Sequence, residues 1–88
     1  MWLFSQHIQT RLKQRNISKN EVLSIVNNEV DSIIIGSPKD ESVDLYFSCI
    51  NQKYIIVVAN KASHVLITTR KMNKKEKMIF IQEIKNVK

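Results

Sequence analysis

The sequence predicts an α+β domain with two N-terminal helices, four strands and a C-terminal helix, in the order ααββββα. Apolar residues recur at helical spacing in the first quarter of the chain and again near its C-terminus. Between residues 30 and 70, β-branched and aromatic residues gather in short runs separated by polar turns. A chain of 88 residues can bury one modest core, so residues 1–88 are expected to form a single domain. We expect a mainly antiparallel sheet whose helices cover one face.

The first helix is predicted over residues 5–15. Ile8 and Leu12 lie four positions apart and supply the apolar stripe of an amphipathic helix. Ser5 is a favourable N-cap because its side-chain oxygen can accept a hydrogen bond from the first turn. Asn16 tolerates the left-handed conformation that ends many helices, so the helix is expected to stop there.

Two capping boxes and four strands complete the predicted fold. Ser18 and Glu21 have capping-box spacing and are expected to begin the second helix. Asn73 and Glu76 have the same spacing before the C-terminal helix. The third strand is apolar on both faces, which predicts a central position in the sheet. The expected strands are 30–35, 43–50, 53–60 and 63–70.

The last predicted strand leads into the most basic stretch of the chain. Side chains alternate along a strand, so successive residues point to opposite faces of the sheet. The face expected to bury apolar surface carries Val65, Ile67 and Thr69. The other face carries His64, Leu66, Thr68 and Arg70. A sheet with one apolar and one cationic face suits a phosphate-rich ligand, and Arg70 is expected to project from the sheet's edge.

The charge distribution favours a polyanionic partner. Fourteen Lys and Arg against eight Asp and Glu leave a formal net charge of +6. The cations concentrate in residues 11–19, which contain no acid, and in residues 70–77, which contain one. RNA, DNA or an acidic protein would suit two such clusters if they meet on one surface. The alternative is a solvated surface that keeps the chain soluble.

Composition disfavours several classes of protein. No run approaches the ~20 apolar residues of a membrane span, and the apolar start ends at Ser5, so we expect a cytoplasmic protein without a signal peptide or membrane partner. The single Cys49 excludes an internal disulfide. Two His and one Cys make no ligand cluster, and one Gly makes no phosphate loop, so neither metal nor cofactor is expected.

The N-terminal segment resembles an uncharacterised family of small domains. In residues 4–22, Phe4 begins a Phe-Ser-x-His pattern that ends at His7. Arg11 and Arg15 follow at regular spacing, and a helix break comes next. Asn stands at the break where Gly is common in that family, which is compatible with a helix stop.

A second segment, residues 66–76, is similar to the end of BrnT toxins. In that pattern an Arg-Lys pair, here Arg70 and Lys71, closes the last strand, and a Glu, here Glu76, follows in a helix. Both groups are related to the RelE-like toxin fold, whose members cleave RNA and are neutralised by a cognate antitoxin. Phe80 stands where a Tyr is frequent, so any role of that phenol is absent from this chain.

The resemblance implies cleavage of RNA without a metal, which requires a base, an acid and cations around the phosphate. It assigns catalytic roles to Arg70, Lys71 and His7. Neighbouring cations are expected to bind the RNA backbone: Arg11, Arg15, Lys74 and Lys75. Each position also has an ordinary structural explanation, such as a solvated strand end for Arg70 or a helix surface for His7.

The leading hypothesis is a toxin that inhibits translation by cutting mRNA, free or on the ribosome, and that an antitoxin from an adjacent gene neutralises. The alternative from another class is a non-catalytic module that uses the same basic surface to bind nucleic acid or an acidic protein. A third is a structural partner whose charge only maintains solubility. Growth arrest on induction, rescued by the neighbouring gene, would separate these hypotheses.

Overall fold

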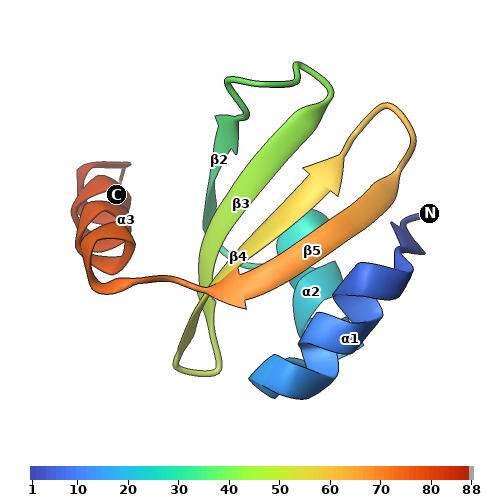
Figure 1. The fold of residues 1–88 in the computed structure, drawn as a ribbon. Coiled ribbons are helices and arrows are strands. Elements are labelled where there is room, and N and C mark those ends of the chain that lie inside the picture. Colours follow the sequence, from blue (N-terminus) through green and yellow to red (C-terminus); the bar gives the residue numbers. More distant parts are fainter. Residues whose placement is uncertain (88) are drawn as a thin grey trace.

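The computed structural model describes residues 1–87, which form a five-stranded sheet with helices on both faces (Figure 1). The elements in chain order are β1 (Leu3–Phe4), α1 (Gln6–Arg15), α2 (Lys19–Val26), β2 (Ser32–Gly36), β3 (Val43–Ile50), β4 (Lys53–Asn60), β5 (Val65–Lys71) and α3 (Lys74–Val87). The predicted α+β class is confirmed, and β1 is a strand that the sequence did not predict.

The strands are ordered β1-β5-β4-β3-β2, and the pairs β2–β3, β3–β4 and β4–β5 are antiparallel. The apolar β4 is therefore the middle strand, as predicted. β1 pairs in parallel with the start of β5, where Leu3 aligns with Val65 and Phe4 with Leu66. The expectation of four strands was wrong because two residues carry no periodic signal, and their pairing depends on a strand edge 62 residues further along the chain.

The α1 and α2 helices pack on one face of the sheet. Their apolar side chains meet alternate residues of β4, together with Tyr46 of β3 and Leu66 of β5, and form the larger of two cores. Ile8 of α1, Ile25 of α2 and Ile55 of β4 are fully buried in it. Each such side chain contributes about 1.5–3 kcal/mol through burial, so this layer provides much of the fold's stability.

The α3 helix packs on the opposite face, near β2 (Figure 1). Phe80 of α3 is buried there against a second apolar cluster that includes Ile56 of β4 and Met72. The ring of Tyr54 meets Phe80 edge-on, with the ring centroids 6.1 Å apart. The prediction that helices cover one face is therefore wrong. Because β4 is apolar on both faces, both faces require a cover.

A β-bulge shifts the register in the middle of β5. Val58 aligns with Thr68, but the next residue of β4, Ala59, aligns with Leu66. Ile67 is therefore the extra residue of β5. A bulge of this kind breaks the strict alternation of side chains along the strand.

The bulge changes which side chains share a face, so the predicted faces are wrong for Val65 and Leu66, whereas Thr69 and Arg70 lie on opposite faces as predicted. Leu66 and Thr69 both lie on the α1 side and are fully buried, although they are three residues apart. Ile67, which was expected to be buried with Thr69, is only partly buried. Arg70 aligns with Ile56 and so lies on the α3 side.

The predicted helix caps are confirmed. Ser5 Oγ accepts a hydrogen bond from the backbone N–H of Ile8 at 3.0 Å. Asn16 ends α1 in the left-handed conformation, with φ at 55°. The capping boxes of α2 and α3 are formed by Ser18 with Glu21 and by Asn73 with Glu76.

Candidate nucleic-acid interface

His7, Arg11 and Arg15 form a stripe along α1 because residues four positions apart share one side of a helix. The helix contains no Asp or Glu. On its opposite side, Lys13 lines a hollow together with Lys19 of α2. The stripe therefore faces away from α2.

The α1 helix lies along β5, beside the edge of the sheet that β1 and β5 form (Figure 1). β1 pairs only with Val65 and Leu66, so the rest of this β5 edge has no strand partner within residues 1–87. Ser5 Oγ donates a hydrogen bond to the carbonyl of Ile67 at 2.7 Å, which holds the start of α1 against the same edge. The α2 helix contacts β3 and β4, which lie further from this edge than β5 does. A stripe that faces away from α2 therefore borders the free edge of β5.

Lys71 lies at the same end of the sheet as the C-terminus of α1. Lys53 Nζ donates a hydrogen bond to the carbonyl of Asn16 at 2.7 Å, which places the end of α1 beside the start of β4. Lys71 aligns with Ile55, two residues further along β4, and Ile55 is buried under α1 and α2. Lys71 therefore points to the α1 side of the sheet. We define the basic edge as His7, Arg11, Arg15 and Lys71.

An imidazole and a guanidinium group lie close together in the basic edge. Arg11 Nε is 3.5 Å from His7 Nε2, which is long for a hydrogen bond, and Arg11 also donates to Gln14 Oε1 at 3.1 Å. His7 is exposed to solvent. An imidazole can exchange a proton near neutral pH, and a guanidinium can bind phosphate through two N–H groups. The pair therefore has the groups needed for both proton transfer and phosphate binding.

Arg70 is separated from the basic edge by its ion pair with α3. Its guanidinium donates to both carboxylate oxygens of Glu76, each at 2.7 Å. The same carboxylate accepts a hydrogen bond from the Asn73 N–H at 2.9 Å. The hydrogen bonds between the two groups hold the pKa of Glu76 below its usual range and raise the pKa of Arg70. A phosphate at Arg70 would have to displace this carboxylate.

The other predicted RNA contacts, Lys74 and Lys75, are exposed on the first turn of α3. This helix covers the face of the sheet opposite α1. In the same helix, Lys77 Nζ lies 4.9 Å from the ring centroid of Tyr54. Of the cations in residues 70–77, only Lys71 shares the α1 side of the sheet.

The strand aromatics and the second histidine have structural roles. Tyr46 is buried in the larger core, and Tyr54 packs against Phe80. His64 lies in the turn before β5, with φ at 58°, and its ring is 5.4 Å from that of Trp2. None of these side chains contributes to the basic edge.

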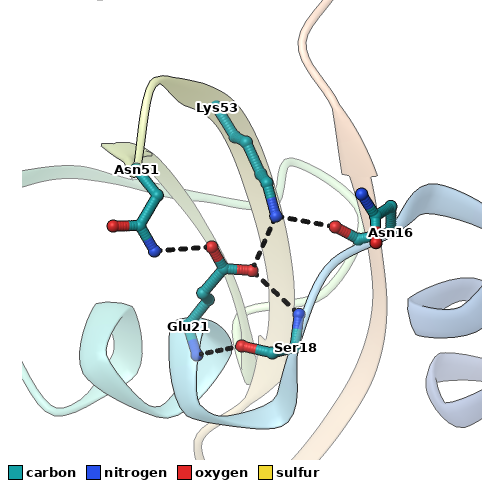
Figure 2. Close-up of polar contacts among 5 residues, drawn as sticks. All are labelled: Asn16, Ser18, Glu21, Asn51 and Lys53. Carbon is teal, nitrogen blue, oxygen red and sulfur yellow. Dashed lines mark hydrogen bonds and ion pairs between the residues drawn. The ribbon is translucent and has the colours of Figure 1, made fainter.

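Figure 2 shows a buried carboxylate that joins α1, α2 and the turn between β3 and β4. Glu21 is only 7% exposed. It accepts hydrogen bonds from the side chain of Asn51 at 2.8 Å, from Lys53 Nζ at 3.1 Å and from the Ser18 N–H at 2.8 Å. Lys53 Nζ also donates to the Asn16 carbonyl. Sequence reasoning found only the capping box, because Lys53 lies 32 residues from Glu21.

This network stabilises the ionised form of Glu21. Burial acts to raise the pKa of Glu21, but the hydrogen bonds from Asn51, Ser18 and Lys53 outweigh it, and the Lys53 charge adds to their effect. Together they lower the pKa of Glu21 to about 2. No buried side-chain nitrogen or oxygen in the described chain lacks a hydrogen-bond partner. The network therefore holds the fold together and leaves no unpaired group for a substrate.

Within residues 1–87, no three His, Cys, Asp or Glu side chains are grouped so that they could hold a metal ion. The described helices include none with the length and apolar character needed to cross a membrane. Cys49 is a free thiol that packs against the α3 cluster.

The family described as Domain of unknown function (DUF4258) matches residues 4–71 of the chain. The chain belongs to the DUF4258 family. The DUF4258 segment runs from β1 to the last residue of β5, so it contains the whole basic edge and leaves α3 outside. This agrees with the predicted membership of an uncharacterised small-domain family. Comparisons with curated proteins and with solved structures give no match.

Proposed function

We propose that this DUF4258 protein is a metal-independent endoribonuclease that binds RNA at the basic edge and acts as the toxin of a toxin–antitoxin pair. The main support is the stripe of one imidazole and two guanidinium groups along the free edge of β5. Lys71 adds a fourth basic group, and α1 contains no Asp or Glu. An RNA backbone presents phosphates at regular intervals, so a row of cations suits it.

In the proposed reaction, the 2′-oxygen of the RNA attacks the adjacent phosphorus. The O2′–P bond forms as the P–O5′ bond breaks, which leaves a 2′,3′-cyclic phosphate and a 5′-hydroxyl. His7 accepts the proton of the 2′-hydroxyl, and water protonates the leaving 5′-oxygen. Arg11 binds the non-bridging oxygens, whose negative charge increases in the transition state. Arg15 and Lys71 bind the flanking phosphates.

The similarity of residues 66–76 to BrnT toxins supports the toxin assignment. The same similarity suggests catalytic roles for Arg70 and Lys71. We retain Lys71 as a phosphate contact. Since Arg70 is paired with Glu76, we assign it to the positioning of α3. An antitoxin encoded by an adjacent gene would neutralise the protein in the cell.

The experiment is RNA cleavage by the purified chain in the presence of EDTA, with analysis of the product ends. We expect cyclic phosphate products. His7→Gln should reduce the cleavage rate by on the order of 10²–10⁴-fold, because it removes one general base. RNA affinity should change by less than about twofold, since the three cations of the basic edge remain.

The matched control is His64→Asn, which removes the only other histidine and keeps a residue that tolerates a left-handed backbone. This variant should cleave as the unmodified protein does. Unchanged cleavage by His7→Gln, or a Mg²⁺ requirement with 5′-phosphate products, would show that the mechanism is wrong. Induction in bacterial cells should arrest growth, and co-expression of the neighbouring gene should restore it.

A second candidate function is a non-catalytic RNA-binding module. The observation that favours it is the single imidazole in the basic edge, because the reaction needs two proton transfers. Salt-sensitive RNA binding without cleavage and without growth arrest would select this candidate.

A further inference from the structure

β2 is an edge strand, and no strand within residues 1–87 pairs with its outer side. Its five residues, Ser32–Gly36, include three consecutive isoleucines and neither a charge nor a proline. Proteins usually protect an edge strand with charged residues, proline or a covering element. The β2 sequence has no such charged or proline residue, so its backbone is suited to pairing with another strand.

Exposed apolar side chains surround the β2 edge. Ile34 and Ile35 are each 48% exposed and point to opposite faces of the sheet. Met78 and Ile79 of α3 are also exposed. A hollow of about 130 Å³ separates β2 from α3, and its apolar lining consists of Ile33, Ile35, Phe47, Ile79 and Phe80.

We infer that β2 and α3 form an interface with a second copy of this chain. Two β2 strands pair antiparallel about a two-fold axis at Ile34, which continues the sheet from one copy into the other. Ile79 lines the same hollow as Ile33 and Ile35, the two neighbours of Ile34, so this arrangement brings the axis close to Ile79. The two α3 helices then lie antiparallel on one face of the combined sheet.

The charges on α3 match this arrangement. Lys75 precedes Ile79 by four residues, and Glu83 follows it by four. When two α3 helices cross antiparallel at Ile79, Lys75 of each copy faces Glu83 of the other. Because Lys75 and Glu83 lie on opposite sides of Ile79, the surface is complementary to a second copy of itself. A two-fold contact requires such self-complementarity.

This surface does not suit RNA. Glu76 and Glu83 line the hollow, and the rest of its lining is apolar. The basic edge lies beside β5, toward the other end of the strand order. A dimer formed through β2 would therefore leave both basic edges open to solvent.

The test is the mass of the full chain in solution, measured by analytical ultracentrifugation over a series of concentrations. We expect a dimer that dissociates on dilution. Ile34→Lys places a charge at the centre of the interface and should raise the dissociation constant by roughly tenfold or more. The control is Leu3→Lys, at a position 58% exposed on the opposite edge of the sheet, and it should leave the dimer unchanged. Circular dichroism shows whether each variant is folded.

A charge exchange tests the arrangement of the helices. Lys75→Glu and Glu83→Lys should each weaken the dimer, and the double variant should restore it. An acid near the start of a helix and a base near its end both favour the helix dipole, so neither change should unfold α3. The proposal is overturned by a chain that stays monomeric or by a dimer that Ile34→Lys leaves intact. A double variant as weak as the single ones also overturns it.

Discussion

Glu21 shows the effect of a hydrogen-bond network on a single buried charge. Its pKa is about 2 instead of the ordinary 4.5. A carboxylate whose pKa is lowered on folding stabilises the protein above the ordinary value, and this stabilisation is lost as the pH falls to the folded value. It is therefore complete above pH 4.5 and disappears between pH 4.5 and about 2. A shift of this size corresponds to on the order of 3 kcal/mol.

The matching variant is Glu21→Gln, which keeps the shape of the side chain and removes its charge. Its free energy of unfolding at pH 7, measured with urea, should be lower by on the order of 1–3 kcal/mol. Its stability should also fall less than that of the unmodified protein as the pH is lowered from 5 to about 3. Glu41→Gln, at an exposed loop position, is the control. Identical pH profiles for Glu21→Gln and the unmodified chain would contradict the role of Glu21.

Arg70 and Glu76 form a more exposed pair, and we expect a smaller effect. The Arg70 side chain is 44% exposed, so solvent screens the interaction despite its two short hydrogen bonds. A double-mutant cycle with Arg70→Ala and Glu76→Ala should give a coupling energy of about 0.5–1 kcal/mol. RNA cleavage by Arg70→Ala should remain near normal if this residue only positions α3. A coupling energy near zero together with lost RNA cleavage would show that Arg70 acts in the reaction centre.

At the scale of secondary structure, the bulge in β5 decides which side chain the core depends on. Leu66→Ala should destabilise the protein by about 2–5 kcal/mol, because Leu66 is fully buried between the sheet and α1. Ile67→Ala should cost no more than about 1–2 kcal/mol, since Ile67 is partly exposed. Urea unfolding of both variants measures the difference. Simple alternation along the strand predicts the reverse order, so a larger loss at Ile67 would exclude this register.

At the scale of the whole molecule, the sheet separates two groups of cations, and RNA binding should depend on one of them. Neutralising Arg11, Arg15 and Lys71 by Gln should make log affinity less dependent on log salt. The slope should fall by about 0.7 for each phosphate contact removed. The measurement is a titration of single-stranded RNA at several salt concentrations.

The control for this titration changes the net charge equally on other surfaces. Gln at Lys39, Lys74 and Lys85 removes three charges from the loop after β2 and from α3. We expect the salt slope to stay close to that of the unmodified chain. Equal losses in both triple variants would mean that RNA responds to net charge and that the basic edge is not a site.

The sequence by itself determined the features that depend on near neighbours. The helix at Ser5, its end at Asn16 and both capping boxes were predicted because each signal lies within about one helical turn. The central position of β4 followed from its apolar residues on both faces. The stripe of His7, Arg11 and Arg15 was readable from helical spacing alone.

Only the tertiary structure decided how these elements meet. The pairing of β1 with β5, the extra residue at Ile67 and the position of α3 involve contacts between distant segments, so no local pattern encodes them. The same contacts place two sequence neighbours on opposite faces of the sheet. Lys71 points to the α1 side of the sheet, whereas Arg70 points to α3 and binds Glu76. The physical reason is that sheet register sets the side of each residue, and register is a property of paired strands.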